Sequence, residues 1–344
     1  MSANDGAHEL AARFIPWFAQ HFGTDDVQVV DALAPSAGYS SRIVLVTLAV
    51  DGRPERRVVR MAPDGPGLSE HYDVAAQTAA MVLAAHAGCP IPGPLIVETD
   101  VATVGTSFVV MPWVDGQQCG ESPAFDPWCR SLTEEQQARR GTTLLDAVAR
   151  IHAADTTAAV EQGVPARDDA AEIAYWERYL DWGFDGSPLP QLVDALAWCA
   201  DHIPEPEGAP VLLWGDVRAG NVIWNPDATP LAVLDWDMTS VGAREHDLAW
   251  LTTLEDTMAV MTRRTLPGQL DRAATITHYE QASGHTLTDL GWYEALAMVR
   301  STAIMSRIAH LNIRAGKPTP FPLEDNPLLD LLDRRIADSR RGDG

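Results

Sequence analysis

Apolar and polar residues alternate along the first third of the chain, which is the pattern of half-buried β-strands. The clearest alternation covers residues 43–50, and the other apolar runs are short and bounded by turn-forming residues. The predicted strands are residues 27–33, 43–50, 56–61, 95–97 and 107–111. Apolar residues at helical spacing predict a packing helix over residues 6–22, and an alanine-rich segment predicts another over 69–87. We therefore expect a five-stranded antiparallel sheet with one main helix.

Beyond residue 112 the apolar pattern changes to helical spacing. The predicted helices are residues 133–152, 168–182, 192–203, 248–261, 269–283, 287–313 and 326–339. We place a domain boundary at the change of pattern, so that residues 1–112 form a small lobe and residues 113–344 form a larger, mainly helical lobe. The pattern thus predicts an α+β fold with two lobes.

Three short apolar runs interrupt the helical region between residues 211 and 237. The last two runs are joined by a turn sequence with two prolines, which predicts a β-hairpin. Folding this hairpin brings Asn221, at the start of one arm, close to Asp235 at the end of the other. Asp216 follows the first run and is expected in a loop just past a strand. An aspartate, an asparagine and a second aspartate then converge at one end of the hairpin.

These side chains have the chemistry that phosphoryl transfer needs. A carboxylate must orient and deprotonate the attacking hydroxyl, and oxygen ligands must hold Mg²⁺ on the phosphates. We expect Asp216 to be the base, and Asn221 and Asp235 to hold Mg²⁺. Asp237 is a further candidate acid of the metal site, and Arg218 is placed to stabilise charge on the transferring phosphate. The alternative is an ordinary hairpin with solvated acids, in a chain with 48 Asp and Glu.

The spacing of this loop resembles that of a known family. Asp216 and Asn221 are five positions apart, and an Asp-Trp-Asp motif follows on a separate run. The segment resembles the phosphotransferase family that includes aminoglycoside phosphotransferases and choline kinases, relatives of the protein kinases. That family usually has HGDxxxxN followed by a DW-acid motif, whereas this chain has Trp214 in place of the histidine. Bracing of the loop by a histidine is therefore lost or replaced by packing.

The resemblance covers nearly the whole chain and carries several implications. It implies a bilobal protein-kinase-like fold in which the small lobe binds the nucleotide. ATP or GTP and Mg²⁺ are the implied cofactors, and a hydroxyl group of a small molecule is the implied acceptor. Asp247 matches an acid of the family that braces the catalytic loop from behind.

A loop of small residues between the first two predicted strands has the layout of a phosphate-covering loop. Gly38, Ser40 and Ser41 are its candidates for contact with the nucleotide phosphates. A plain hairpin turn is the alternative for this loop. The resemblance also implies a hinge after the last strand of the sheet, where backbone groups of Met111 and Trp113 are expected to meet the nucleotide base.

Lys317 is the only lysine in the chain, so the small lobe lacks the lysine that usually grips the nucleotide phosphates. The resemblance places Arg60 at that position, and arginine keeps the positive charge while adding a fork that suits phosphate oxygens. A surface arginine on an edge strand is the alternative. Gln77 stands where the family has a glutamate that pairs with the lysine, and it can offer only a hydrogen bond to Arg60.

Composition and charge limit the class of partner. The net charge of −23 and the pI near 4.6 disfavour binding to nucleic acid or to anionic membranes, which require a basic surface. The cysteines show no CxxC spacing and no grouping with histidine, so neither a structural metal nor a disulfide framework is expected. They are Cys89, Cys119, Cys129 and Cys199. No targeting or membrane-spanning pattern is present, and we expect a cytoplasmic protein.

The acceptor is predicted by resemblance alone. Residues 172–176, 214–221 and 234–238 look most like a bacterial branch related to the kinase domains that accompany acyl-CoA dehydrogenases. That branch implies phosphorylation of a hydroxyacyl-CoA. Phosphorylation of an aminoglycoside or another antibiotic is the rival, which the acidic composition favours. A third alternative is a pseudokinase that binds nucleotide without turnover, because Trp214 and the two changed positions of the small lobe depart from the family pattern.

Overall fold

The computed structural model describes residues 3–34, 40–63, 65, 67–205, 207–319, 321–323 and 326–342. Contacts along the chain divide it into two compact units. The first comprises Met1–Thr78 and Pro92–Asp115, and the second comprises Ala79–Ile91 and Gly116–Gly344.

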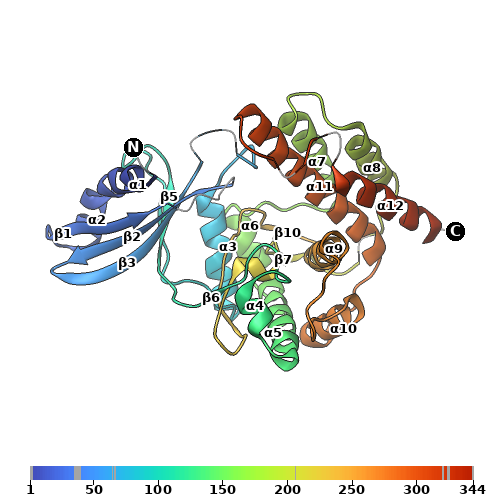
Figure 1. Cartoon of the computed structure of the whole chain (residues 1–344), viewed down its shortest axis with the longest axis horizontal. Helices are drawn as coiled ribbons and strands as arrows, with labels where there is room; N and C mark the ends of the chain where they lie inside the picture. Colours follow the sequence, from blue (N-terminus) through green and yellow to red (C-terminus); the bar gives the residue numbers. More distant parts are fainter. Residues whose placement is uncertain are drawn as a thin grey trace. The chain divides into compact units, whose positions relative to one another are not determined.

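The first unit is built on a five-stranded sheet in which every neighbouring pair of strands is antiparallel (Figure 1). Its strands are β1 (Val27–Leu33), β2 (Arg42–Val50), β3 (Arg53–Met61), β4 (Ile96–Glu98) and β5 (Phe108–Pro112). They lie in the order β1-β2-β3-β5-β4. The five-stranded antiparallel sheet predicted from alternation is therefore confirmed, with strand ends that differ by a few residues.

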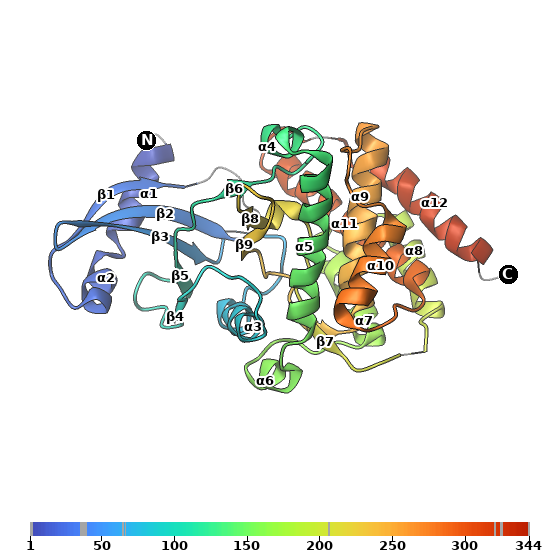
Figure 2. The ribbon, with the colours of Figure 1, turned by 90° about the horizontal axis from the view of Figure 1, so that it is seen from below.

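Two helices, α1 (Ala3–Ala12) and α2 (Ile15–Phe22), cover one face of this sheet (Figures 1 and 2). Phe14 and Phe18 are fully buried there, and the ring of Phe14 meets that of Phe108 edge to face, with centroids 5.0 Å apart. The prediction of one helix over residues 6–22 is wrong. Pro16 has no N–H to donate to the carbonyl four positions earlier, which belongs to the last residue of α1, so the helix breaks there.

Helix α3 (Val74–His86) begins later than the predicted residue 69. The carboxylate of Asp73 accepts hydrogen bonds from the backbone N–H groups of Ala75 and Ala76, both at 3.0 Å. Aspartate in this position satisfies N–H groups that have no partner within the helix, which sets the start of the helix. The division between the two units falls inside α3, after Thr78.

The second unit is mainly helical (Figure 2). Its helices are α4 (Pro127–Ser131), α5 (Glu134–His152), α6 (Thr156–Glu161), α7 (Asp169–Gly183), α8 (Pro190–Asp201), α9 (Glu245–Thr262), α10 (Arg272–Ser283), α11 (Leu290–Arg314) and α12 (Pro327–Gly342). Helix α5 packs beside α10, and α9 packs beside α11. A capping box formed by Thr133 and Gln136 starts α5. Within the described residues, no helix is both long enough and apolar enough to cross a membrane.

Short strands of the second unit position the candidate site. Strands β8 (Val222–Trp224) and β9 (Pro230–Val233) form the predicted hairpin, and β6 (Gln117–Gln118) pairs with β8 at its other edge. Strands β7 (Val211–Leu213) and β10 (Ser240–Gly242) form a separate antiparallel pair. The hairpin is therefore confirmed, whereas β6 and β10 were not predicted, because Gln-Gln and Ser-Val-Gly are not apolar runs.

Candidate active site

A sharp turn after β7 places the first site residue. Gly215 has φ +90°, and a Cβ atom there would lie 2.3 Å from the backbone oxygen of Met238. An L-side chain is disfavoured by the backbone conformation and excluded by this contact. The turn follows a fully buried strand and carries the chain into Asp216, which lies in a loop just past the strand as predicted.

The carboxylate of Asp216 is held by side chains from three directions. Trp250 on α9 donates its indole N–H to Oδ1 at 2.8 Å, and the side-chain amide of Asn221 donates to Oδ2 at 2.6 Å. The Nε of Arg218 donates to Oδ2 at 3.1 Å. Burial raises the pKa of Asp216, Arg218 opposes this, and the nearby Asp235 raises the pKa further, so that the net shift is upward. A carboxylate with a raised pKa is a stronger base once it is ionised.

Asn221 and Asp235 meet at the open end of the hairpin. The backbone N–H of Leu234 donates to the carbonyl of Asn221 at 2.8 Å, which places Asp235 one residue beyond this contact. The side-chain amide nitrogen of Asn221 donates two hydrogen bonds to Asp216. They do not involve the amide oxygen, which is the atom that suits magnesium. Asp235 has φ 59°, a left-handed conformation that aspartate tolerates better than most residues do. Asp237 is partly buried two positions further on.

Trp214 links the loop to the end of the hairpin. Its indole N–H donates to the carbonyl oxygens of Leu234, at 2.8 Å, and Asp235, at 3.1 Å. The ring is fully buried and lies beside that of Trp236, with centroids 6.3 Å apart. The histidine of the usual family loop is therefore replaced by a hydrogen-bonded tryptophan, and not by packing alone.

Asp247, at the start of α9, braces the loop from behind. Its carboxylate accepts the backbone N–H of Trp214 at 2.9 Å and that of Gly215 at 2.8 Å. The imidazole of His152 lies 3.1 Å from the same carboxylate, and its other ring nitrogen is 2.7 Å from the hydroxyl oxygen of Tyr279. The expected bracing role of Asp247 is confirmed, and His152 extends it.

Arg218 connects the loop to an acidic residue from outside it. Its guanidinium pairs with Asp216 and with Glu121, whose side chain is 86% exposed. Burial of the guanidinium lowers the pKa of Arg218, but these two carboxylates outweigh burial, so the net shift is upward. Arg218 therefore stays charged and is held between two acids.

Two of these contacts were not predicted from the sequence. Trp250 lies three positions after Asp247, so both face the loop from the same side of α9, and this helical spacing is the only signal that marks it. Glu121 is an exposed acid in a loop, among 48 acidic residues, and nothing in its surroundings in the sequence distinguishes it.

The predicted phosphate-contacting residues lie in the first unit. Arg60 on β3 donates from Nε to the hydroxyl of Ser41 at 3.0 Å, and both side chains are buried. Ser40 precedes Ser41 and is partly exposed, while Gly38 lies outside the described residues. Gln77 is buried in the first turns of α3. Arg60 is thus a buried residue, so the alternative of a surface arginine is wrong.

The predicted hinge follows β5. Met111 is buried within the strand, and the backbone N–H of Trp113 donates to the carbonyl of Arg56 at 3.2 Å. The indole N–H of Trp113 donates to Asp115 at 2.7 Å, and the guanidinium of Arg56 lies over its ring, 4.1 Å from the centroid. The backbone N–H of Trp113 therefore pairs within its own unit.

Comparison with known proteins agrees with this loop and this fold. The catalytic loop and the fold together define a phosphotransferase with a protein-kinase-like bilobal α+β fold. The chain belongs to the phosphotransferase enzyme family, whose sequence model matches residues 31–285. It is 30% identical to acyl-CoA dehydrogenase family member 11 of Gallus gallus over 200 residues, which are 57% of this chain and 25% of that protein. The chain thus spans about a quarter of the length of this relative.

Solved structures show the same fold. A putative aminoglycoside phosphotransferase from Ralstonia eutropha superposes with a TM-score of 0.66 at 19% identity, over 96% of each chain. The GDP and kanamycin complex of the aminoglycoside phosphotransferase APH(2")-IIIa superposes with a TM-score of 0.57 at 15% identity, over 96% of this chain and 99% of that one. The expected bilobal kinase-like fold is therefore confirmed.

Proposed function

We propose that this phosphotransferase moves the γ-phosphoryl group of a nucleoside triphosphate to a hydroxyl group of a small molecule, with Asp216 as the base. The observation that carries the proposal is the fixed carboxylate of Asp216, which Trp250, Asn221 and Arg218 hold in a loop braced by Asp247. A base must be oriented before it can accept the proton of the attacking hydroxyl. Three donors on one carboxylate provide that orientation.

The residues at the end of the hairpin fit a magnesium ion. Asn221 and Asp235 offer an amide oxygen and a carboxylate, which are the hard oxygen ligands that Mg²⁺ prefers, and Asp237 is a further acid nearby. Asp235 also raises the pKa of Asp216, and a cation between such acids relieves their repulsion. When bound, Mg²⁺ would neutralise charge on the phosphates. Arg218 would add a second positive charge by exchanging its contact with Glu121 for a phosphate oxygen.

The first unit supplies the proposed nucleotide site. The buried pair of Arg60 and Ser41 supports it, because a guanidinium held by a neighbouring hydroxyl presents a fixed positive charge. The proposed nucleotide-binding residues are Gly38, Ser40, Ser41, Arg60, Gln77, Met111 and Trp113. ATP and GTP are both candidates, since one of the solved structures with this fold is a GDP complex.

For the acceptor we propose a hydroxyacyl-CoA. The support is the relative named as an acyl-CoA dehydrogenase family member, which matches 57% of this chain.

The rival acceptor is an aminoglycoside. A structure with the same fold was solved with kanamycin, and the net charge of −23 attracts polycations at long range. The sequence identity to that protein is 15%, so the likeness supports the fold and not the acceptor.

A nucleotide-consumption assay separates the two acceptors. The full chain is incubated with ATP or GTP, Mg²⁺, and either hydroxyacyl-CoAs, aminoglycosides or a macrolide, and products are identified by mass. The matched control substrate is an acyl-CoA that lacks the hydroxyl group. We expect a phosphorylated product from the hydroxyacyl-CoA and none from its control. A phosphorylated aminoglycoside with unreacted hydroxyacyl-CoA would move the assignment to the rival. No phosphorylated product from any compound would contradict both acceptors.

A further inference from the structure

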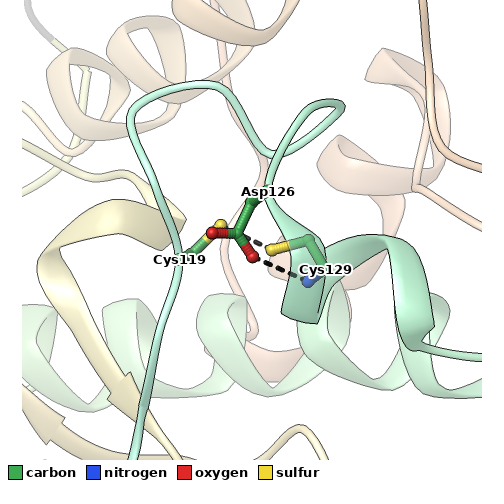
Figure 3. Close-up of side chains that lie close together, drawn as sticks. All are labelled: Cys119, Asp126 and Cys129. Carbon is green, nitrogen blue, oxygen red and sulfur yellow. Dashed lines mark hydrogen bonds between the residues drawn. The ribbon is translucent and has the colours of Figure 1, made fainter.

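Two cysteines that are ten positions apart in the sequence meet inside the second unit. Cys119 follows β6 and Cys129 lies in α4, and their sulfur atoms are 2.7 Å apart (Figure 3). Cys119 is 3% exposed and Cys129 is 0% exposed, so the two thiols lie against each other and away from solvent. The spacing of the cysteines gave no reason to expect this contact.

The surroundings of the two sulfurs bring them together and lower the pKa of one of them. The carboxylate of Asp126 accepts the backbone N–H of Cys129 at 2.8 Å (Figure 3). It also accepts the backbone N–H of Gly120 at 3.1 Å, which ties the two ends of the loop together. A nitrogen of the Arg140 guanidinium lies 3.5 Å from each sulfur. A hydrogen bond from Cys129 lowers the pKa of Cys119, burial opposes this, and Arg140 lowers it further, with a net downward shift. Cys119 is therefore the better nucleophile of the pair.

We propose that Cys119 and Cys129 are a dithiol site that forms a reversible disulfide with a small-molecule disulfide as oxidant. The thiolate of Cys119 attacks a sulfur of the oxidant, and a mixed disulfide forms as one small thiolate leaves. The thiolate of Cys129 then attacks the sulfur of Cys119, and the second small thiol leaves. The two cysteines lose two protons and two electrons, and the oxidant is reduced to two thiols. Because both thiols are buried, the first attack requires this turn to open, and the residue next to Cys119, Gly120, is exposed.

A metal ion is the other ligand that this cluster suggests. Cys119, Asp126 and Cys129 place their ligand atoms within 4.8 Å of one another, and they are the only such group among the described histidines, cysteines and acids. The guanidinium of Arg140 puts a positive charge beside both sulfurs, which opposes a second cation there. A closed zinc site also needs a fourth ligand, and this group offers three. The charges therefore favour the dithiol.

The disulfide would close a loop that reaches the catalytic loop. Glu121, two residues after Cys119, pairs with Arg218. A Cβ atom on Gly220 would lie 3.6 Å from the carbonyl oxygen of Cys119, so the two loops pack closely. The crosslink would hold Glu121 on Arg218 and would keep that arginine from a phosphate. This slowing of turnover rests on the proposed function, whereas formation of the disulfide does not.

Mapping of the crosslink in the full chain tests the proposal. The protein is incubated with oxidised glutathione, blocked with an alkylating agent, and digested without reduction by a glutamate-specific protease. Cleavage after Glu121 separates the two cysteines unless they are linked, whereas trypsin would not, because no Lys or Arg lies between them. We expect a linked pair containing Cys119 and Cys129, loss of two of the four thiols, and recovery of both with dithiothreitol.

Matched variants make the result specific. Cys89→Ser and Cys199→Ser remove the other two buried thiols and should leave the linked pair unchanged. Cys119→Ser and Cys129→Ser should abolish it, and thermal denaturation checks that each variant is folded. Four free thiols after oxidation, or links that include Cys89 or Cys199, would overturn the proposal. So would stoichiometric binding of zinc alone that protects both thiols from glutathione.

The link to turnover has its own readout. The oxidised wild type should consume nucleotide more slowly than the reduced protein, and Glu121→Gln should lose this difference while still losing two of its four thiols on oxidation. The thiol count is the readout for this variant, because Glu121 is the residue after which the protease cuts between the two cysteines. A mapped crosslink without any change in turnover would leave the disulfide established and refute the effect through Arg218. If the chain transfers no phosphate to any acceptor, the crosslink is still decided by mass alone.

Discussion

The hydrogen bond from Trp214 to the end of the hairpin makes a prediction about magnesium binding. In Trp214→Phe the ring stays in its buried position, but the indole N–H that serves the carbonyls of Leu234 and Asp235 is lost. Leaving part-buried acceptors without their donor costs about 1–2 kcal/mol. Asp235 is in a left-handed conformation, so the substitution removes a hydrogen bond from a residue whose backbone is already strained. If Asp235 holds the metal and this energy is lost from the metal-bound state alone, binding of Mg²⁺ weakens by roughly 5–30-fold.

The assay is the dependence of turnover on Mg²⁺ concentration at saturating nucleotide, with thermal denaturation measured beside it. Trp236→Phe is the matched control, because Trp236 is equally buried but its indole donates to Val233, at 3.3 Å, and not to Asp235. We expect the half-saturating Mg²⁺ concentration to rise in Trp214→Phe and to stay unchanged in Trp236→Phe. Equal shifts in both variants, or no shift in Trp214→Phe, would refute this account of the tryptophan.

Three further predictions follow from the same loop and its neighbours. Gly215→Ala should unfold at markedly lower temperature and lose activity, because the added Cβ would lie 2.3 Å from a backbone oxygen; a melting temperature like that of the wild type would contradict this. Arg218→Ala should lower kcat by about a hundredfold with a smaller effect on KM, since its charge is proposed to act on the transition state, and steady-state kinetics can separate the two effects. Burial raises the pKa of Glu255 to about 7, and Arg140 only partly offsets this. Because the folded value exceeds the unfolded one, this contribution to stability is full below about pH 4.5 and is lost as the pH rises to about 7. Glu255→Gln should therefore stabilise the fold by about 1–3 kcal/mol at pH 8 and have little effect near pH 4.5, as measured by denaturant unfolding.

The sheet and the hairpin were predictable because their signals are local. Alternation along residues 43–50 and the proline-rich turn between β8 and β9 each fix a strand pairing within a few residues of sequence. The same holds for the capping box at Thr133 and Gln136. The convergence of Asn221 and Asp235 follows from the hairpin alone, since its two arms must end together.

Other features depend on contacts between distant segments, which a single sequence does not encode locally. The donor from Trp250 to Asp216 exists only once α9 has packed against the loop, and the contact of Cys119 with Cys129 exists only once the loop between them has closed. The break before α2 had a local cause in Pro16, but the apolar spacing continues across it and hides it. For Trp214 we predicted that bracing of the loop is either lost or replaced by packing, whereas its indole N–H makes the link.

The most direct test of the central claim is the substitution Asp216→Asn, measured with the same preparation in two ways. Calorimetry with ATP or GTP and Mg²⁺ gives the nucleotide affinity, and the consumption assay with an accepted hydroxyl compound gives turnover. The side chain keeps its size and its contact with Trp250 at Oδ1, but an amide cannot accept the proton of the hydroxyl. We predict nearly unchanged nucleotide binding with turnover lost. Full turnover in Asp216→Asn would contradict the assignment of Asp216 as the base.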